Sequence, residues 1–164
     1  MINWSLVLID GTVLSLLIVP IVIFSFLRRP RIWLGDFPDD IAASTDPITP
    51  EEKSLAAKVG LSVVAVMLVV LALSSARFGF ESGFFWAALH TFLVFQFFNI
   101  VDISMDWVML WRIDPADPPI PGTANAPGWT NYSFHFWASV KGSVIGLPFA
   151  AIAAGLGWLA VTYL

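Results

Sequence analysis

Five polar side chains interrupt an apolar segment that is long enough to cross a membrane. Residues 90–111, HTFLVFQFFNIVDISMDWVMLW, contain His90, Gln96, Asn99, Asp102 and Asp106. Carboxylates and an imidazole in such a segment can bind protons or cations, and intramembrane ionisable residues are functional candidates by default. At a helical rotation of about 100° per residue, Asn99, Asp102 and Asp106 fall within an arc of roughly 60°, whereas His90 lies roughly 160° from Asp106. The segment therefore predicts two polar sites, on opposite faces and at different depths.

The inner of these two sites gains candidate partners from the next apolar segment. Lys141 lies six residues after His135, and Asp106 lies six residues before Arg112, so Asp106 and Lys141 should have a similar depth. An ion pair between them is therefore predicted. Two carboxylates one turn apart repel each other, so one should hold a proton unless Lys141 or a cation compensates. The predicted inner polar site comprises Asn99, Asp102, Asp106, His135 and Lys141.

The outer site combines His90 with an acid of the first apolar segment. Asp10 lies about two turns into that segment and can meet His90 at the same depth. Such a pair can be functional, or it can simply fix helix packing. A haem b shared by His90 and His135 is disfavoured, because residues 90–112 alone would cover roughly 33 Å as a helix. The sequence assigns no cofactor, and its loops contain no EF-hand spacing for a metal ion.

Four apolar segments must position these side chains. They predict an all-α membrane protein, a single domain of residues 1–164 with transmembrane helices at about residues 4–27, 55–76, 84–111 and 136–163. The second helix should begin before its apolar part, because Thr49-Pro50-Glu51-Glu52 combines an N-cap, a proline at the first helical position and first-turn carboxylates. A cleaved signal peptide is disfavoured, since the basic run follows the first apolar segment instead of preceding it.

The composition favours the bilayer over a soluble core. Of the 164 residues, 58% are hydrophobic and 12% are charged, and the mean hydropathy is +0.82. Soluble domains are typically about 45–50% apolar and about 25% charged. The chain has no cysteine, which excludes disulfides, thiolate zinc sites, cysteine-ligated iron–sulfur clusters and covalent c-type haem. A net charge of -4 without a basic stripe gives no support for nucleic-acid binding.

Lys and Arg are distributed very unevenly about the four spans. Two long connections, residues 28–54 and 112–135, fall on the side that carries seven of the eight basic residues, and only Arg77 falls on the other side. Because cytoplasmic loops carry the excess of Lys and Arg, both connections are predicted to be cytoplasmic and both termini to lie outside. The connections are rich in Pro, Asp and Gly and predict turns and caps, with Asp39 or Asp40 capping a short helix at residues 41–44.

Small residues recur at every fourth position of the last segment, at Gly142, Gly146, Ala150 and Ala154. Such a ribbon lets two helices approach closely. Its partner is predicted to be another helix of this chain. The alternative is that the ribbon contacts a second copy of the chain or a larger membrane complex.

Several short motifs resemble those of a bacterial protein group. They are DxxxDW from Asp102, IPGT from Ile120, YxFHF from Tyr132 and KG from Lys141. In these motifs, mostly in its second half, the chain is similar to uncharacterised bacterial integral membrane proteins with four predicted spans. The resemblance implies the four-span topology and a location in the bacterial inner membrane. It implies no activity.

Three functions fit these residues. The first is a small membrane accessory or structural protein, either alone or as a subunit of a larger complex. It fits because no HExxH, GxSxG, Walker A or dinucleotide-binding pattern occurs. The second is a proton- or cation-coupled transporter that uses Asp102, Asp106 and Lys141. The third is a membrane enzyme that acts on lipid headgroups at the cytoplasmic face, with His135 as acid or base. Asp102 in a water-filled cavity would favour transport. A dry Asp–Lys pair would favour the structural role, and convergence of His135, Asp102 and Asp106 around one ion would favour the enzyme.

Overall fold

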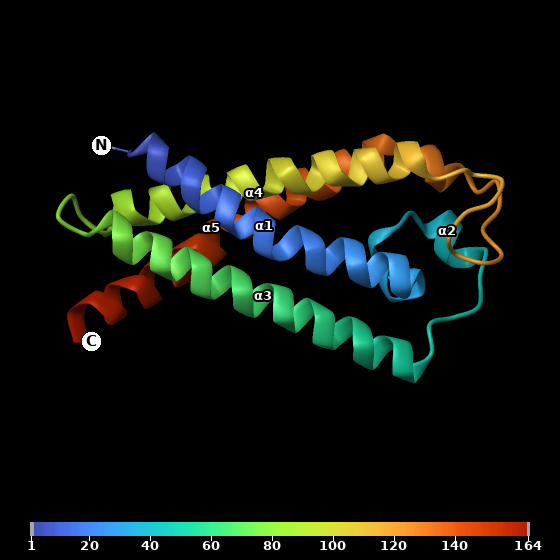
Figure 1. Ribbon diagram of the computed structural model, residues 1–164, viewed down its shortest axis with the longest axis horizontal. Coiled ribbons are helices and arrows are strands. Elements are labelled where there is room, and N and C mark those ends of the chain that lie inside the picture. The colour runs from blue at the N-terminus through green and yellow to red at the C-terminus, as the bar shows by residue number, and fades with distance from the viewer. Residues whose placement is uncertain (1, 164) are drawn as a thin grey trace.

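The chain folds into four long helices that are roughly aligned (Figure 1). The computed structural model describes residues 2–163. The long helices are α1 (Trp4–Arg28), α3 (Pro50–Phe78), α4 (Phe84–Arg112) and α5 (Tyr132–Tyr163). Each is long and apolar enough to cross a membrane, and no strand occurs among the described residues. The predicted all-α membrane protein with four spans is confirmed.

Capping interactions explain where two of these helices begin. Thr49 is the predicted N-cap of α3: its Oγ1 accepts the Glu52 N–H at 3.2 Å, and the Thr49 N–H donates to Glu52 Oε2 at 2.8 Å. This reciprocal pair satisfies two backbone donors at the start of the helix. α5 begins at Tyr132, before its apolar segment, because Asn131 Oδ1 accepts the Phe134 N–H at 3.0 Å. The added turn brings His135 into a helix that packs on α4.

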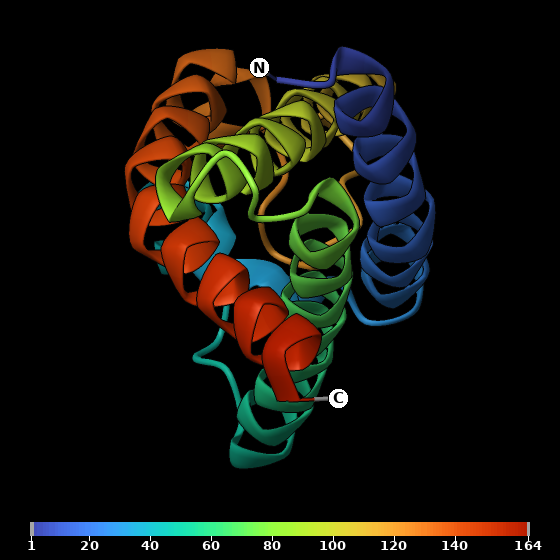
Figure 2. The same cartoon turned by 90° about the vertical axis from the view of Figure 1, so that its left-hand side faces the viewer.

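An apolar core occupies the middle of the bundle. α4 contacts α1, α3 and α5, and α3 also contacts both α1 and α5 (Figure 2). The core consists of Val7, Leu14, Ile18, Leu71, Val94, Phe95, Phe98 and Ala153. Many other large apolar side chains on all four helices are exposed. This is expected of helices that face lipid, where the backbone is already hydrogen-bonded internally and the side chains need not be covered by protein.

The small-residue ribbon of α5 packs within this chain. Gly146 lies against the Phe95 ring so closely that an added Cβ would overlap it. Ala150 and Ala154 are 1% and 0% exposed. One turn further, a Cβ at Gly157 would come within 2.6 Å of a backbone carbonyl oxygen of α3. Gly146, Ala150 and Ala154 are therefore covered by neighbouring helices of their own chain, whereas Gly142 is half-buried.

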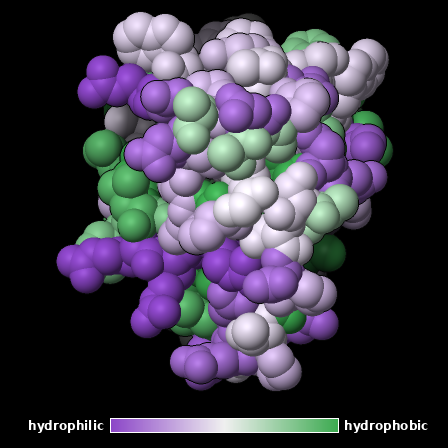
Figure 3. All heavy atoms as spheres, turned by 90° about the vertical axis from the view of Figure 1, so that its right-hand side faces the viewer, coloured by the Kyte–Doolittle hydropathy of each residue, from purple (hydrophilic) through white to green (hydrophobic). Residues whose placement is uncertain are grey.

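The two long connections fold over the same end of the bundle, which we call the loop end; the opposite end, with both termini, is the terminal end (Figure 1). The first connection contains η1 (Pro30–Asp36) and α2 (Asp39–Ala43), and the second contains η2 (Pro127–Thr130). Buried Ile41, Ile120 and Trp129 join them in a small apolar core. The prediction that Asp39 or Asp40 caps this short helix is wrong, because α2 begins at Asp39 and has no side-chain cap. Asp40 Oδ2 instead accepts the Gly128 N–H at 2.7 Å and so links the two connections. Seen from this end, the surface is mixed: hydrophilic and near-neutral residues predominate, and hydrophobic residues lie among them (Figure 3).

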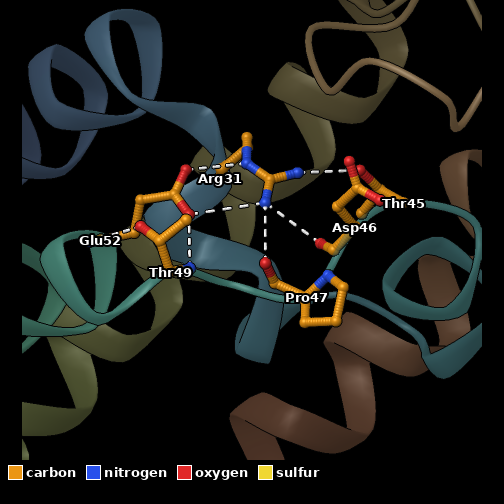
Figure 4. A network of polar contacts seen from close by, with 6 residues as sticks. All are labelled: Arg31, Thr45, Asp46, Pro47, Thr49 and Glu52. Carbon is orange, nitrogen blue, oxygen red and sulfur yellow. Dashed lines mark hydrogen bonds and ion pairs between the residues drawn. The ribbon is translucent and has the colours of Figure 1, made fainter.

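Arg31 fixes the first connection against the start of α3 (Figure 4). Its Nε donates to Glu52 Oε1 at 2.8 Å, and its Nη1 donates to Thr45 Oγ1 at 2.8 Å. Its Nη2 donates to the carbonyl oxygens of Asp46 and Pro47 at 3.1 and 3.3 Å. The hydrogen bond to Glu52 raises the pKa of the Arg31 guanidinium above its ordinary value. Because Glu52 also completes the cap of α3, one guanidinium holds η1, the following loop and α3 together.

Candidate functional site

A cavity of about 510 Å³ lies between the helices toward the loop end, and we call it the loop-end cavity. Aromatic and aliphatic side chains form most of its walls. Among the residues that the structure describes, no Lys or Arg lines it. Four of the five predicted inner-site residues do line it, and Lys141 does not. The polar lining residues are Asp36, Asn99, Asp102, Asp106, His135 and Ser139.

Asp106 is paired with His135 rather than with Lys141. Asp106 Oδ2 lies 3.1 Å from His135 Nδ1, and the His135 side chain is 7% exposed. Lys141 is exposed and has no ion pair among residues 2–163, so the predicted Asp106–Lys141 pair is wrong. Six residues rotate a helix by about 600°, so a Lys141 side chain points roughly 120° away from His135. Similar depth suggested the pair, but Lys141 lies about 9 Å from His135 along α5, so both the axial alignment of α5 with α4 and its rotation prevent it.

Asn99 fixes α4 to α5 beside the cavity. Its Nδ2 donates to Ser143 Oγ at 2.9 Å and to the Ser139 carbonyl oxygen at 3.1 Å. The Ser143 hydroxyl in turn donates to Gln96 Oε1 at 3.0 Å. Polar side chains that hydrogen-bond across helices in this way stabilise helix association in membranes. Asn99 and Gln96 therefore position α5 relative to the carboxylates of α4.

Asp102 is a carboxylate of α4 in the cavity that has no partner among the described residues. Among residues 2–163 it forms no ion pair and accepts no hydrogen bond, whereas Asp106 one turn away contacts His135. A charged side chain at the centre of a membrane helix costs roughly 2.5–3.5 kcal/mol on insertion scales. Asp102 is therefore best accommodated either as a neutral acid or beside a cation in the cavity.

Asp36 is a cavity residue that the sequence did not indicate. It follows the first span in η1 and lies at the loop-end side of the cavity, where it shares a smaller adjoining pocket of about 60 Å³ with Asp106 and His135. Although the Asp36 side chain remains exposed, the surrounding protein atoms partly desolvate its carboxyl group and raise its pKa, and the negative charge of Asp106 raises the pKa further. No pattern separates Asp36 from the other acids of its connection, because its position depends on how η1 folds back on the helices.

Replacing Asp36 with asparagine should stabilise the protein at neutral pH and have little effect at about pH 3, below the ordinary Asp pKa of about 3.9. Because the pKa is raised in the folded state, ionised Asp36 favours the unfolded state. This penalty appears as the pH rises from the ordinary value through the raised one. Thermal unfolding in detergent at the two pH values measures the difference. Asp117→Asn, at an exposed acid of the second connection, is the control, and an equal shift of Asp36→Asn at both pH values would contradict the prediction.

A second polar cluster joins α1, α3 and α4 at the terminal end. Ser74 Oγ donates to Asp10 Oδ2 at 2.6 Å and lies 3.1 Å from His90 Nε2. Arg77 Nη1 lies 3.1 Å from Asp10 Oδ1. Asp10 Oδ2 and His90 Nε2 are 4.0 Å apart, so the two predicted outer residues meet mainly through Ser74. We call Asp10, Ser74, Arg77 and His90 the terminal-end cluster.

The hydrogen bonds of the terminal-end cluster determine where its protons lie. Ser74 has one hydroxyl proton and donates it to Asp10, so His90 must donate its Nε2–H to Ser74 Oγ. His90 Nδ1 is then a buried acceptor without a partner in the described part of the chain, and the ring stacks on Phe78 with centroids 4.5 Å apart. The sequence did not indicate Ser74 or Arg77, because neither is unusual until α3 is placed beside Asp10. Three helices are held together by this chain of contacts.

The terminal-end cluster and the loop-end cavity are separate. Between them lies the apolar core around Leu14, Leu71 and Val94. Within residues 2–163, no group of three or more His, Asp or Glu side chains is arranged to hold a metal ion. The bundle therefore presents an acidic cavity on one side of an apolar barrier and a closed hydrogen-bonded cluster on the other.

Comparisons with known proteins provide no relative from which a role could be transferred. No protein-family model matches the chain, and no curated protein or solved structure matches it. The resemblance of its motifs to uncharacterised bacterial four-span membrane proteins stays a prediction. The function must therefore be argued from the two polar sites.

Proposed function

We propose that the protein is a proton- or cation-coupled transporter and that the loop-end cavity is its binding site. The observation that carries the proposal is the cavity of about 510 Å³, which Asp36, Asp102 and Asp106 line without any Lys or Arg among the described residues. Ligand sites usually occupy about 300–1,000 Å³. Carboxylates in a poorly solvated site favour a proton or a cation beside them. His135 can balance only one of the three charges.

The cavity walls favour an organic cation over a bare metal ion. Trp33, Phe98 and Phe134 line the cavity together with the carboxylates. Aromatic faces attract cations with about 0.5–2 kcal/mol, depending on how far the pair is desolvated. A metal ion would need converging ligands, and residues 2–163 offer no such group. A proton on Asp102 can replace the organic cation, and this competition would couple the movement of protons to that of the substrate.

The geometry supports the two other functions less. A structural role for the carboxylates depended on an Asp106–Lys141 pair, and Asp106 contacts His135 instead. An enzyme acting on lipid headgroups would need Asp102, Asp106 and His135 to surround one ion, and they are not arranged to do so. An accessory subunit docked through α5 would need its small-residue ribbon exposed, and Gly146, Ala150 and Ala154 of that ribbon are covered within the chain.

Binding of tetraphenylphosphonium to the purified protein in detergent tests the proposal. We expect saturable binding that weakens as the pH falls, because protons compete for the same carboxylates. Triphenylphosphine oxide, which has similar aromatic surface and no charge, should bind much less. Equal binding of the two compounds would contradict a cation site. Proteoliposomes then test transport, since a pH gradient should drive uptake of tetraphenylphosphonium. Uptake at the same rate with and without the gradient would contradict the coupling.

We further propose that the protein lies in a bacterial inner membrane with its loop end in the cytoplasm. Seven of the eight Lys and Arg residues lie in the loop-end half of the fold, and Arg77 lies at the terminal end. Because the chain has no cysteine, cysteines introduced singly at Asn3 and Ser44 would be unique thiols. An impermeant maleimide applied to intact cells should label position 3 and not position 44. Labelling of position 44 alone would reverse the orientation.

A further inference from the structure

An apolar groove of about 580 Å³ lies on the surface between α1 and α3. α3 diverges from α1 toward the loop end (Figures 1 and 2). Phe24 is 61% exposed and Leu55 is 37% exposed. Both lie on helices that are apolar enough to cross a membrane, so the groove faces lipid. Its apolar walls are Pro20, Ile21, Phe24, Leu55 and Val59.

Two arginines close the loop end of this groove. Arg28 and Arg29 line the groove and also line an adjoining pocket of about 420 Å³. Ile32 and Leu55 are shared by the two spaces as well, so the groove continues into the pocket. α1 ends at Arg28. Basic residues at the end of a membrane helix lie at the level of the lipid headgroups.

The positive charge of these arginines is only partly balanced by the protein. Of the five charged residues around the pocket, Arg31 and Glu52 form an ion pair at 2.8 Å and neutralise each other. Arg28 and Arg29 then face the single carboxylate of Glu51. Neither arginine forms an ion pair among residues 2–163, and the guanidinium of Arg28 lies over the Phe24 ring, 4.8 Å from its centroid. An anion is the complementary ligand for this end of the groove.

We infer that the α1–α3 groove binds an anionic glycerophospholipid. One acyl chain lies along the apolar walls, and the phosphate contacts the guanidinium groups of Arg28 and Arg29. Arginine suits this role because its planar fork can donate two hydrogen bonds to one phosphate. Stacking on Phe24 holds Arg28 at the boundary between the groove and the pocket, where the phosphate of a lipid with its chain in the groove must lie.

A lipid fits better than a soluble anion, for two reasons. The cationic pocket is continuous with an apolar groove that a free phosphate would leave empty. Both arginines are also exposed, so an isolated anion would compete with water for them, whereas an acyl chain adds apolar contacts of its own. The groove shares no lining residue with the loop-end cavity, so this inference is independent of the proposed transport function.

Native mass spectrometry of the full chain tests the inference. The protein is exchanged into equal amounts of phosphatidylglycerol and phosphatidylcholine with identical acyl chains, and the retained lipid is identified. We expect preferential retention of one phosphatidylglycerol. Replacing Arg28 and Arg29 together with glutamine should reduce the preference about 25-fold, at roughly fivefold for each arginine near an anionic lipid. Replacing both with lysine should keep most of the preference, which separates charge loss from misfolding.

Two further variants separate the headgroup contact from the acyl-chain contact. Arg112→Gln removes an exposed charge at the end of α4, outside the groove, and should leave the preference unchanged. Val59→Trp fills the groove and should reduce retention of both lipids while leaving their ratio unchanged. The inference is overturned if both lipids are retained equally, or if Arg112→Gln lowers the preference as much as the glutamine pair does. Displacement of the lipid by inorganic phosphate would indicate a simple anion site and would also overturn it.

Discussion

Replacing Ser74 with alanine should lower the free energy of unfolding by about 2–4 kcal/mol, because each buried polar group left without a partner costs ~1–3 kcal/mol. The hydroxyl donates to Asp10 at 2.6 Å and lies 3.1 Å from His90, so its loss affects a carboxylate and an imidazole together. The same change at Ser75 should have little effect or stabilise the protein. The Ser75 hydroxyl is fully buried and has no hydrogen-bond partner among residues 2–163, so its removal relieves an existing penalty.

The two serine variants form a matched pair, since they remove the same atom from adjacent buried residues of α3. Unfolding in mixed micelles, followed by tryptophan fluorescence, measures both. Arg77 continues to contact Asp10 in Ser74→Ala, which places the expected loss toward the lower end of the range. A similar loss of stability in both variants would show that the contact of Ser74 with Asp10 and His90 does not stabilise the fold.

Replacing Asp102 with asparagine should weaken the binding of tetraphenylphosphonium about 10- to 100-fold, since a contact with a charged group contributes ~1.5–3 kcal/mol. Among residues 2–163 Asp102 has no protein partner, so the substitution removes a charge from the cavity without breaking a contact. Asp106→Asn differs, because Asp106 lies 3.1 Å from His135. It should lower both binding and stability, whereas Asp102→Asn should lower binding alone.

Calorimetric titration at neutral pH measures the effect of Asp102→Asn. Asp117→Asn, which removes an equal charge at an exposed position away from the cavity, should bind tetraphenylphosphonium as the wild type does. The binding that remains in Asp102→Asn should also depend less on pH, because one of the competing carboxylates is gone. Unchanged affinity in Asp102→Asn would contradict the assignment of the loop-end cavity as the cation site.

The four spans could be predicted because they depend on properties that are local in the chain. A segment in hydrocarbon must satisfy its own backbone hydrogen bonds, so the length of an apolar run is enough to predict a helix. The N-cap at Thr49 depends on residues within one turn and could be predicted equally well. The start of α5 could not be predicted, because Asn131 extends that helix into a segment without apolar periodicity.

The separation of the polar residues of α4 into two sites could also be predicted from the local sequence. The helical period alone placed His90 and Asp106 on different faces. In the structure His90 contacts Ser74 of α3, and Asp106 contacts His135 of α5. The direction in which each residue points along α4 is thus a property of the segment itself.

The partners of those residues were decided by the tertiary structure. Lys141 lies about 9 Å from His135 along α5. The alignment of α5 along α4 and its rotation about its own axis together select His135 for Asp106. Asp36 and Ser74 enter the two sites because η1 folds back and α3 lies beside α1. Helix rotation is determined by contacts along the whole interface, such as Gly146 against Phe95 on α4. These contacts join residues that are far apart in the chain, so no short stretch of sequence specifies them.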